Sequence, residues 1–358
     1  MTAHQVTNRI RSRQYDAPSK TRLSDGSDML ATCEWPGATV GTPVALMDHH
    51  IPRVEDGRPL PPELQGAVIA LGNFDGFHIG HQAVVSRAVE MARDRGVAAI
   101  VATFDPHPIR HFSPDIEPFH LTTLDQRQRL FAKAGADAMM LFRFGSDLAS
   151  VSPERFIQGY LARAGGVVTG DGFSFGRGRA GTVQMFARLA AQQGIAYEAI
   201  DSISFGDVRI SSTRIRDALR LGDCSTVQAL LSRPFTIRGA LQLHGQIDMQ
   251  GGPLLASVGM QGYLRPRQGR YAVIARLADG RSLRCTAHVS PRAADAAGQD
   301  RLWLTGRHLR NDMRGRLTEI EFKSLLLETS SQSLSQSRAR LGRCWHRGRH
   351  QRRGLGGA

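Results

Sequence analysis

The sequence predicts a doubly wound parallel α/β domain followed by a smaller β domain. Between residues 67 and 200, short apolar runs typical of buried strands alternate with segments of helical periodicity, which is the pattern of a parallel sheet with helices on both faces. A glycine-rich turn joins the first of these strands to the first helix. Strand-like alternation returns at residues 271–277 and 301–304 and predicts the second domain.

The elements of the first domain follow one another in a regular order. Strands are predicted at residues 67–71, 97–103, 136–142, 165–169 and 195–200. Helices are predicted at residues 79–93, 125–134, 153–163 and 183–193, and a further helix begins within residues 209–216. The apolar residues of the first helix that we expect to face the sheet are Ile79, Ala83, Val84, Ala88 and Ala92. In such sheets ligands bind at the carboxyl ends of the strands, so the loops after these strands are the candidate site.

Length and composition restrict the class of protein. The chain has 358 residues, 41% hydrophobic and 22% charged, which suits two globular domains. No apolar run reaches the length of a membrane span, and the N-terminus has no continuous apolar signal region, so we expect a soluble cytoplasmic protein without a membrane partner. Four widely spaced cysteines without a C-x-x-C pair favour reduced thiols over a disulfide framework or a zinc cluster.

The two ends of the chain differ from its middle. Residues 1–65 show no sustained periodicity and are predicted to form a disordered extension or linker. Residues 329–358 are predicted to form a disordered basic tail, with seven arginines between Arg338 and Arg353 that account for half of the net charge of +14. Such a tail can bind RNA or anionic lipid non-specifically, but we favour an unstructured terminus without a defined role and predict no specific nucleic-acid partner.

The strongest candidate site is the segment GNFDGFHIGH at residues 72–81, between the first strand and the first helix. Free backbone N–H groups and the helix dipole attract phosphate at such a position. His78 and His81 share one face of the first helical turn, and Gly80 lets a nucleotide approach the backbone. The H-x-G-H pattern resembles the adenylyl-transfer signature of nucleotidylyltransferases and class I aminoacyl-tRNA synthetases, which predicts nucleotide binding and leaves the second substrate open.

Two further motifs follow predicted strands. In FDPHP at residues 104–108, two prolines stiffen a turn and project Asp105 and His107 above the edge of the sheet. In GDGFSFGRGRAG at residues 170–181, glycines and arginines suit a phosphate-contacting loop, and Phe173 and Phe175 offer flat apolar surface to an aromatic ring. A plain turn and a flexible surface loop are the competing interpretations.

The fourth motif is RISSTRIR at residues 209–216, which begins a helix. An N-cap needs one hydroxyl residue, and this segment has three between arginines. The resulting candidates for gripping a triphosphate are Arg209, Ser211, Ser212, Thr213, Arg214 and Arg216.

In this order and spacing, the four motifs resemble the FMN adenylyltransferase domain of the bacterial bifunctional riboflavin kinase/FAD synthetase family, over roughly residues 66–232. The resemblance implies a Rossmann-like nucleotidylyltransferase domain that transfers AMP from ATP to FMN, giving FAD and pyrophosphate with Mg²⁺. It assigns catalysis to His78, His81, Arg209, Ser212 and Thr213.

The same resemblance assigns the remaining site residues. Those expected to shape or contact the ATP site are Gly72, Phe74, Asp75, Gly80, Ser211 and Arg216. Those expected near the flavin are Asp171, Phe173, Phe175 and His107. The flavin loop departs from the family's Gly-acid-Asp-Phe pattern, since Gly172 stands in place of the second acid. No resident metal site is predicted, because Mg²⁺ is held mainly by phosphates and water.

The resemblance extends to a riboflavin kinase β-barrel over residues 233–328. The kinase hallmark Gly-x-Pro-Thr-Ala-Asn is absent, since residues 252–259 read GPLLASVG, and the later glutamate has no counterpart at residues 299–302. We therefore predict a degenerate kinase barrel and a monofunctional FAD synthetase of open oligomeric state. The alternatives are a non-catalytic flavin or nucleotide sensor and another H-x-G-H nucleotidylyltransferase, whereas the missing Lys-Met-Ser-Lys-Ser loop counts against a tRNA-charging enzyme.

Overall fold

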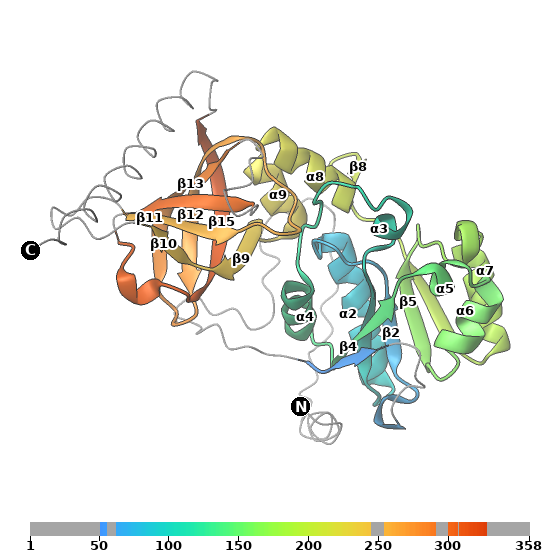
Figure 1. The fold of residues 1–358 in the computed structure, drawn as a ribbon. Helices are drawn as coiled ribbons and strands as arrows, with labels where there is room; N and C mark the ends of the chain where they lie inside the picture. Colours follow the sequence, from blue (N-terminus) through green and yellow to red (C-terminus); the bar gives the residue numbers. More distant parts are fainter. Residues whose placement is uncertain (1–50, 56–61, 245–253, 291–299, 307, 328–358) are drawn as a thin grey trace, which may run out of the picture.

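The computed structural model describes residues 51–55, 62–244, 254–290, 300–306 and 308–327 (Figure 1). The predicted basic tail, residues 329–358, and most of the predicted N-terminal extension lie outside the described residues. None of the helices in the described part of the chain is both long and apolar enough to cross a membrane.

A six-stranded parallel sheet forms the first domain, in the order β1-β4-β3-β2-β5-β6. Its strands are β1 (Arg53–Glu55), β2 (Val68–Leu71), β3 (Ala99–Asp105), β4 (Ala138–Arg143), β5 (Gly166–Gly170) and β6 (Ala196–Ile200). The chain runs outward from β2 through β3 to β4 and then returns to the other side of β2 through β5. This reversal between β2 and β5 is the topological switch point at which such sheets bind ligands.

The helices are α2 (Ile79–Asp94), α3 (Pro108–Phe112), α4 (Leu124–Lys133), α5 (Ser146–Ala149), α6 (Pro153–Tyr160), α7 (Val183–Gln192), α8 (Ser212–Leu221) and α9 (Cys224–Leu231). Along β2, Val68 and Ala70 pack in one core cluster with α2 and α4, whereas Ile69 and Leu71 pack in another with α6 and α7. Alternate residues of the strand therefore bury both faces, and Figure 1 shows the two helical layers on opposite sides of the sheet. The predicted doubly wound sheet is confirmed.

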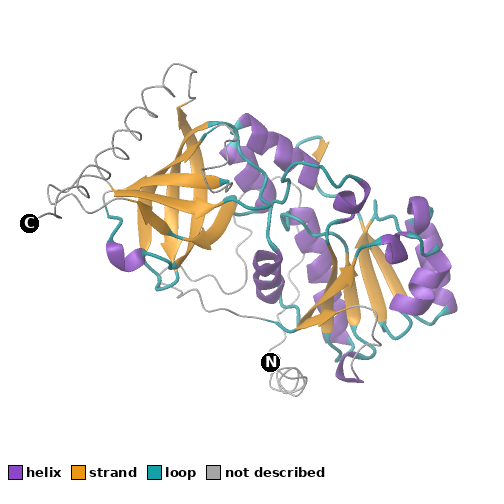
Figure 2. Cartoon of the chain, in the orientation of Figure 1, coloured by secondary structure: helices purple, strands orange, loops and turns teal. Residues whose placement is uncertain are grey.

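A seven-stranded antiparallel sheet forms the second domain and curves into a nearly closed barrel, in the order β10-β11-β14-β13-β12-β15-β9 (Figure 2). Its strands are β9 (Thr236–Ala240), β10 (Gln242–His244), β11 (Leu254–Gly259), β12 (Gly269–Leu277), β13 (Ser282–Val289), β14 (Arg301–Gly306) and β15 (Leu317–Leu327). On β12 the alternate residues Tyr271, Val273 and Ala275 are buried, as expected for a barrel with a filled interior.

Helices α8 and α9 join the two domains. Ile215 of α8 and Val227 of α9 belong to the same buried cluster as Phe235 and Tyr271 of the barrel. Ile79, which was predicted to face the sheet, instead packs against this cluster and is only partly buried, so that prediction was wrong. The start of α2 therefore touches the helices that carry the barrel.

Candidate functional site

The loop between β2 and α2 is held by aromatic side chains that enter the core. Phe74 and Phe77 have positive φ angles of 50° and 43°, and both rings are buried. Each meets the ring of Phe131 on α4 edge-on, with centroids 5.7 and 5.3 Å apart. This packing compensates the strained backbone. Phe74 therefore supports the predicted nucleotide loop from the core. Its ring lies edge-on to the ring of His81, with centroids 5.3 Å apart.

His78 and His81 lie together at the N-terminus of α2. Their rings stack with centroids 3.6 Å apart and planes inclined by 18°. His78 is the N-cap residue, and its Nδ1 accepts a hydrogen bond of 3.2 Å from the backbone N–H of His81. A Cβ atom on Gly80 would lie 3.2 Å from Cε1 of His78, so the glycine leaves room for this ring.

Both imidazoles are neutral near pH 7. Burial lowers the pKa of His78 to about 4, and the charge of Arg233 acts in the same direction. Burial and the neighbouring His78 likewise lower the pKa of His81. Because Nδ1 of His78 accepts from the backbone, its proton is assigned to Nε2. The ring can therefore donate a hydrogen bond to an anion at the helix N-terminus.

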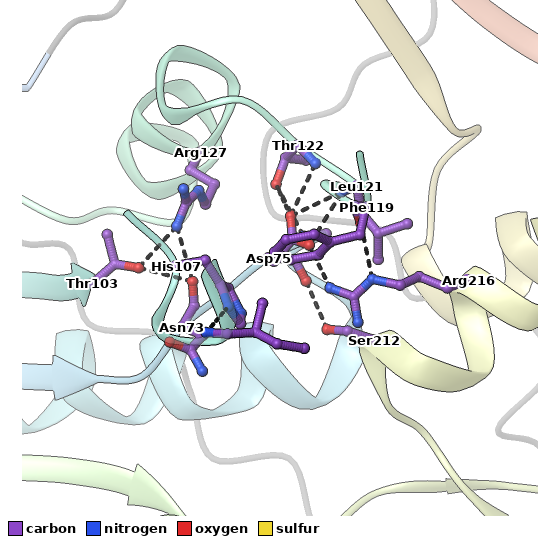
Figure 3. Close-up of polar contacts among 12 residues, drawn as sticks. Asn73, Asp75, Thr103, His107, Phe119, Leu121, Thr122, Arg127, Ser212 and Arg216 are labelled. Carbon is purple, nitrogen blue, oxygen red and sulfur yellow. Dashed lines mark hydrogen bonds and ion pairs between the residues drawn. The ribbon is translucent and has the colours of Figure 1, made fainter. Parts of the chain in front are cut away.

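Asp75 joins this loop to two other segments (Figure 3). Its buried carboxylate accepts hydrogen bonds from the backbone N–H groups of Leu121 and Thr122, each at 3.0 Å, and pairs with Nη2 of Arg216 at 2.7 Å. Burial raises the pKa of Asp75, but the cations Arg216 and Arg127 outweigh it, and the pKa stays below its usual range. This carboxylate is occupied by structural partners, so Asp75 fixes the position of the loop between β2 and α2.

Arg127 is a member of this network that the sequence motifs did not mark. Its side chain is buried on α4, and Nη1 donates to the carbonyl of Asn73 at 3.0 Å and to Oγ1 of Thr103 at 2.9 Å (Figure 3). Arg127 lies four residues before the core residue Phe131 and shares its helix face. A charged residue on an apolar helix face was the signal in the sequence that could have indicated this role.

Side chains of the RISSTRIR motif hold the loop between β2 and α2. Ser211 is the N-cap of α8, and Ser212 Oγ donates to the backbone carbonyl of Asp75 at 2.8 Å. Arg216 donates through Nε to the carbonyl of Phe119 at 2.9 Å and lies over that ring at 5.2 Å. Its guanidinium therefore acts on the protein, whereas Thr213 in the first turn of α8 is exposed.

The loop after β5, which is predicted to contact flavin, contains one partly exposed and one buried phenylalanine. The ring of Phe175 is 6% exposed and packs against Phe186 at 4.9 Å and Phe156 at 5.7 Å, so it belongs to the core. Phe173 stacks on Phe175 with centroids 5.9 Å apart and remains partly exposed. Of the two, Phe173 is the ring available to a ligand.

Polar groups fix the start of this loop. Asp171 accepts hydrogen bonds from the backbone N–H and hydroxyl of Ser202, and Arg209 pairs with it at 2.9 Å. A Cβ atom on Gly172 would lie 2.8 Å from Nη2 of Arg209. The position where the family pattern has a second acid therefore faces this arginine.

The FDPHP motif also reaches the network. His107 caps α3, with Nδ1 accepting from the backbone N–H of Ile109 at 3.2 Å. Burial lowers the pKa of His107 to about 4, and its ring meets Phe119 edge-on at 5.1 Å. Phe119 thus connects His107 to Arg216 and Asp75 at the carboxyl edge of the sheet. No cluster of three or more potential metal-binding side chains is found among the described residues.

Comparisons with known proteins show the family of the chain. The family model for FAD synthetase matches residues 60–214. A bifunctional riboflavin kinase/FMN adenylyltransferase from Pseudomonas fluorescens is 35% identical over 237 residues, covering 65% of this chain and 75% of that protein. Its counterpart of the same name from Escherichia coli K12 is 29% identical over 283 residues, covering 78% of this chain and 90% of that protein.

A solved structure shares the fold of both domains. The crystal structure named as a macrolide-efflux protein from Streptococcus pneumoniae superposes with a TM-score of 0.67 and 23% identity. The superposition covers 82% of this chain and 98% of that chain.

Proposed function

The chain belongs to the riboflavin kinase/FMN adenylyltransferase family and contains its FAD synthetase domain, and from this premise we propose that it transfers AMP from ATP to FMN, giving FAD and pyrophosphate. The observation that supports this most directly is the stacked pair of neutral histidines at the N-terminus of α2, beside the switch point of the sheet. ATP enters as its magnesium complex, with the metal held mainly by phosphates and water.

The reaction needs alignment and charge stabilisation. The phosphate of FMN is already anionic, so its oxygen attacks the α-phosphorus of ATP without a protein nucleophile, and the bond to the leaving pyrophosphate breaks. Nε2–H of His78, the ring of His81 and the free N–H groups of α2 face the phosphates and stabilise the charge that develops on them. The remaining phosphate contacts come from two exposed residues. Arg209 lies just before α8, and Thr213 lies in its first turn.

The other predicted residues divide between the two substrates and the frame. Asp171, Phe173 and His107 line the flavin side, with Phe175 as the buried support of Phe173. The frame that places the nucleotide loop consists of Gly72, Phe74, Asp75, Gly80, Ser211, Ser212 and Arg216.

We further propose that the barrel does not phosphorylate riboflavin. The two regions in which the family resemblance leads us to expect the kinase residues lie on neighbouring strands, β11 and β14, with Ser257 opposite Trp303. There, His244 Nε2 and Ser257 Oγ are 2.8 Å apart, and Arg301 donates to the same hydroxyl at 3.2 Å. In this region, Arg301 is a cation, and the carboxylate of Asp300 beside it pairs with Arg265. Gly252, Pro253 and Gln299 of these regions lie outside the described residues.

The adenylyltransferase proposal is tested by FMN-dependent pyrophosphate release from ATP. His78→Ala and His81→Ala are each expected to lower kcat roughly 100-fold or more, because they remove donors to the developing charge. His288→Ala on β13 is the matched control and should keep the wild-type rate. FMN fluorescence reports binding in the same variants. A wild-type protein that binds FMN but releases no pyrophosphate would favour the sensor, and histidine variants with unchanged kcat would contradict the assigned roles.

A further inference from the structure

We infer that Arg233, in the linker between α9 and the barrel, is a positioning residue of the adenylyl-transfer site. The inference rests on the proposed function and adds to it a residue outside all four motifs. It also assigns the linker a task beyond joining two domains.

The guanidinium of Arg233 binds the nucleotide loop directly. Nη2 donates to the carbonyl of Gly76 at 2.7 Å, and Nη1 donates to the carbonyls of Phe77 at 3.3 Å and Leu231 at 3.1 Å. Gly76 and Phe77 are the two residues before His78, and both have positive φ angles. One planar fork thus joins the strained end of the loop to the last turn of α9.

Gln82 repeats the connection from the other side. Its Nε2 donates to the carbonyl of Phe77 at 2.9 Å and to the carbonyl of Leu231 at 3.1 Å. The same two carbonyls therefore receive donors from α2 and from the linker. Ser232, which has a φ of 56°, turns the chain between Leu231 and Arg233.

The charge of Arg233 acts on the same site. Burial lowers the pKa of Arg233 to about 10, so the side chain remains a cation at pH 7. This charge adds to the positive potential where the ATP phosphates bind and favours the neutral form of His78. A loss of Arg233 therefore removes both a mechanical support of the loop and a nearby positive charge.

The linker also connects the barrel to the loop. Strand β9 begins at Thr236, three residues after Arg233, and Phe235 between them is buried in the cluster of α8, α9 and the barrel. This short segment therefore joins the barrel to the two loop carbonyls that Arg233 binds.

The test measures FMN-dependent FAD formation by the full-length protein with saturating ATP. Arg233→Ala is expected to lower kcat about 100-fold, because a misplacement of about 1 Å at such a loop has this effect, while KM for FMN stays within about twofold. Added guanidinium chloride at low concentration should restore part of the rate. Arg233→Lys should restore little, because an ammonium group cannot bind both the loop and α9. Arg220→Ala, at the exposed end of α8, is the control.

A second variant separates position from charge. Gln82→Ala removes two hydrogen bonds to the same carbonyls without changing the charge, so kcat is expected to fall roughly tenfold. This variant also tests the inference if Arg233→Ala does not fold. Unchanged kcat in folded Arg233→Ala, or in Gln82→Ala and Arg233→Lys together, would overturn the inference. A wild-type protein without activity would instead overturn the proposed function on which the inference rests.

Discussion

Replacing Asp75 by asparagine should destabilise the first domain strongly. The carboxylate is 1% exposed, and its partner Arg216 is 15% exposed, so the variant leaves a cation with little water and no counter-charge. Removing one partner of a buried ion pair costs about 3–5 kcal/mol. With the amide oxygen in the place of Oδ1, the new NH2 group takes the place of Oδ2 and faces the N–H donors of Arg216 and Leu121, which adds to the loss.

The effect is measured by urea and thermal unfolding. At roughly 2–4 °C per kcal/mol for a domain of this size, the melting temperature of Asp75→Asn should fall by about 6–20 °C. Asp115→Asn, an exposed carboxylate in the segment before Phe119, is the control and should change little. The double variant Asp75→Asn/Arg216→Met should recover part of the loss, with a coupling of roughly 0.5–3 kcal/mol. If Asp75→Asn lowers the free energy of unfolding by less than about 1 kcal/mol, the reasoning is refuted.

Three further predictions concern other parts of the site. The pKa of His78 is about 4 in the folded protein, against 6.5 for an ordinary histidine. The contribution of the neutral ring to stability is therefore fully present above pH 6.5. About 3 kcal/mol of the free energy of unfolding is lost as the pH falls toward 4. Urea unfolding at pH 5 and pH 7.5 should show about 2 kcal/mol of this loss, and His78→Gln should reduce the difference. Phe175→Ala should lower the free energy of unfolding by about 3–5 kcal/mol. Phe173→Ala should lower it less and should raise KM for FMN. Equal stability losses in the two variants would contradict the assignment of Phe175 to the core and Phe173 to the ligand. In Gly172→Asp, the new carboxylate should pair with Arg209, whose exposed side chain can move to make room for it. The free energy of unfolding should then change by at most about 1 kcal/mol. A larger loss in unfolding experiments would contradict the open geometry of this loop.

The parallel sheet was predictable because its signals are local. Each buried strand is a short apolar run, and α2, α4, α6 and α7 have their own helical periodicity, so the order of the elements follows from neighbouring residues. Strand β1 lies within the segment predicted as an extension, and only its parallel pairing with β4, in which Arg53 faces Met139, makes it a strand. Such a pairing joins residues far apart in sequence and leaves no local pattern.

The place of the candidate site in the fold was predictable for the same reason, but the direction of its side chains was not. The motif at residues 72–81 opens α2 as expected, and the two histidines share one face. The task of Arg216 depends on Asp75, which lies 141 residues away in the chain, and the burial of Phe175 depends on Phe156 and Phe186. These contacts are set by tertiary packing, which single motifs do not encode.

The most direct test of the proposed function is a chromatographic product assay with purified protein, ATP and Mg²⁺, run in parallel with FMN and with riboflavin. We predict that FAD and pyrophosphate form from FMN and that no product forms from riboflavin. FMN or FAD formed from riboflavin would contradict the loss of kinase activity in the barrel. The absence of FAD with FMN as substrate would contradict the account of the first domain.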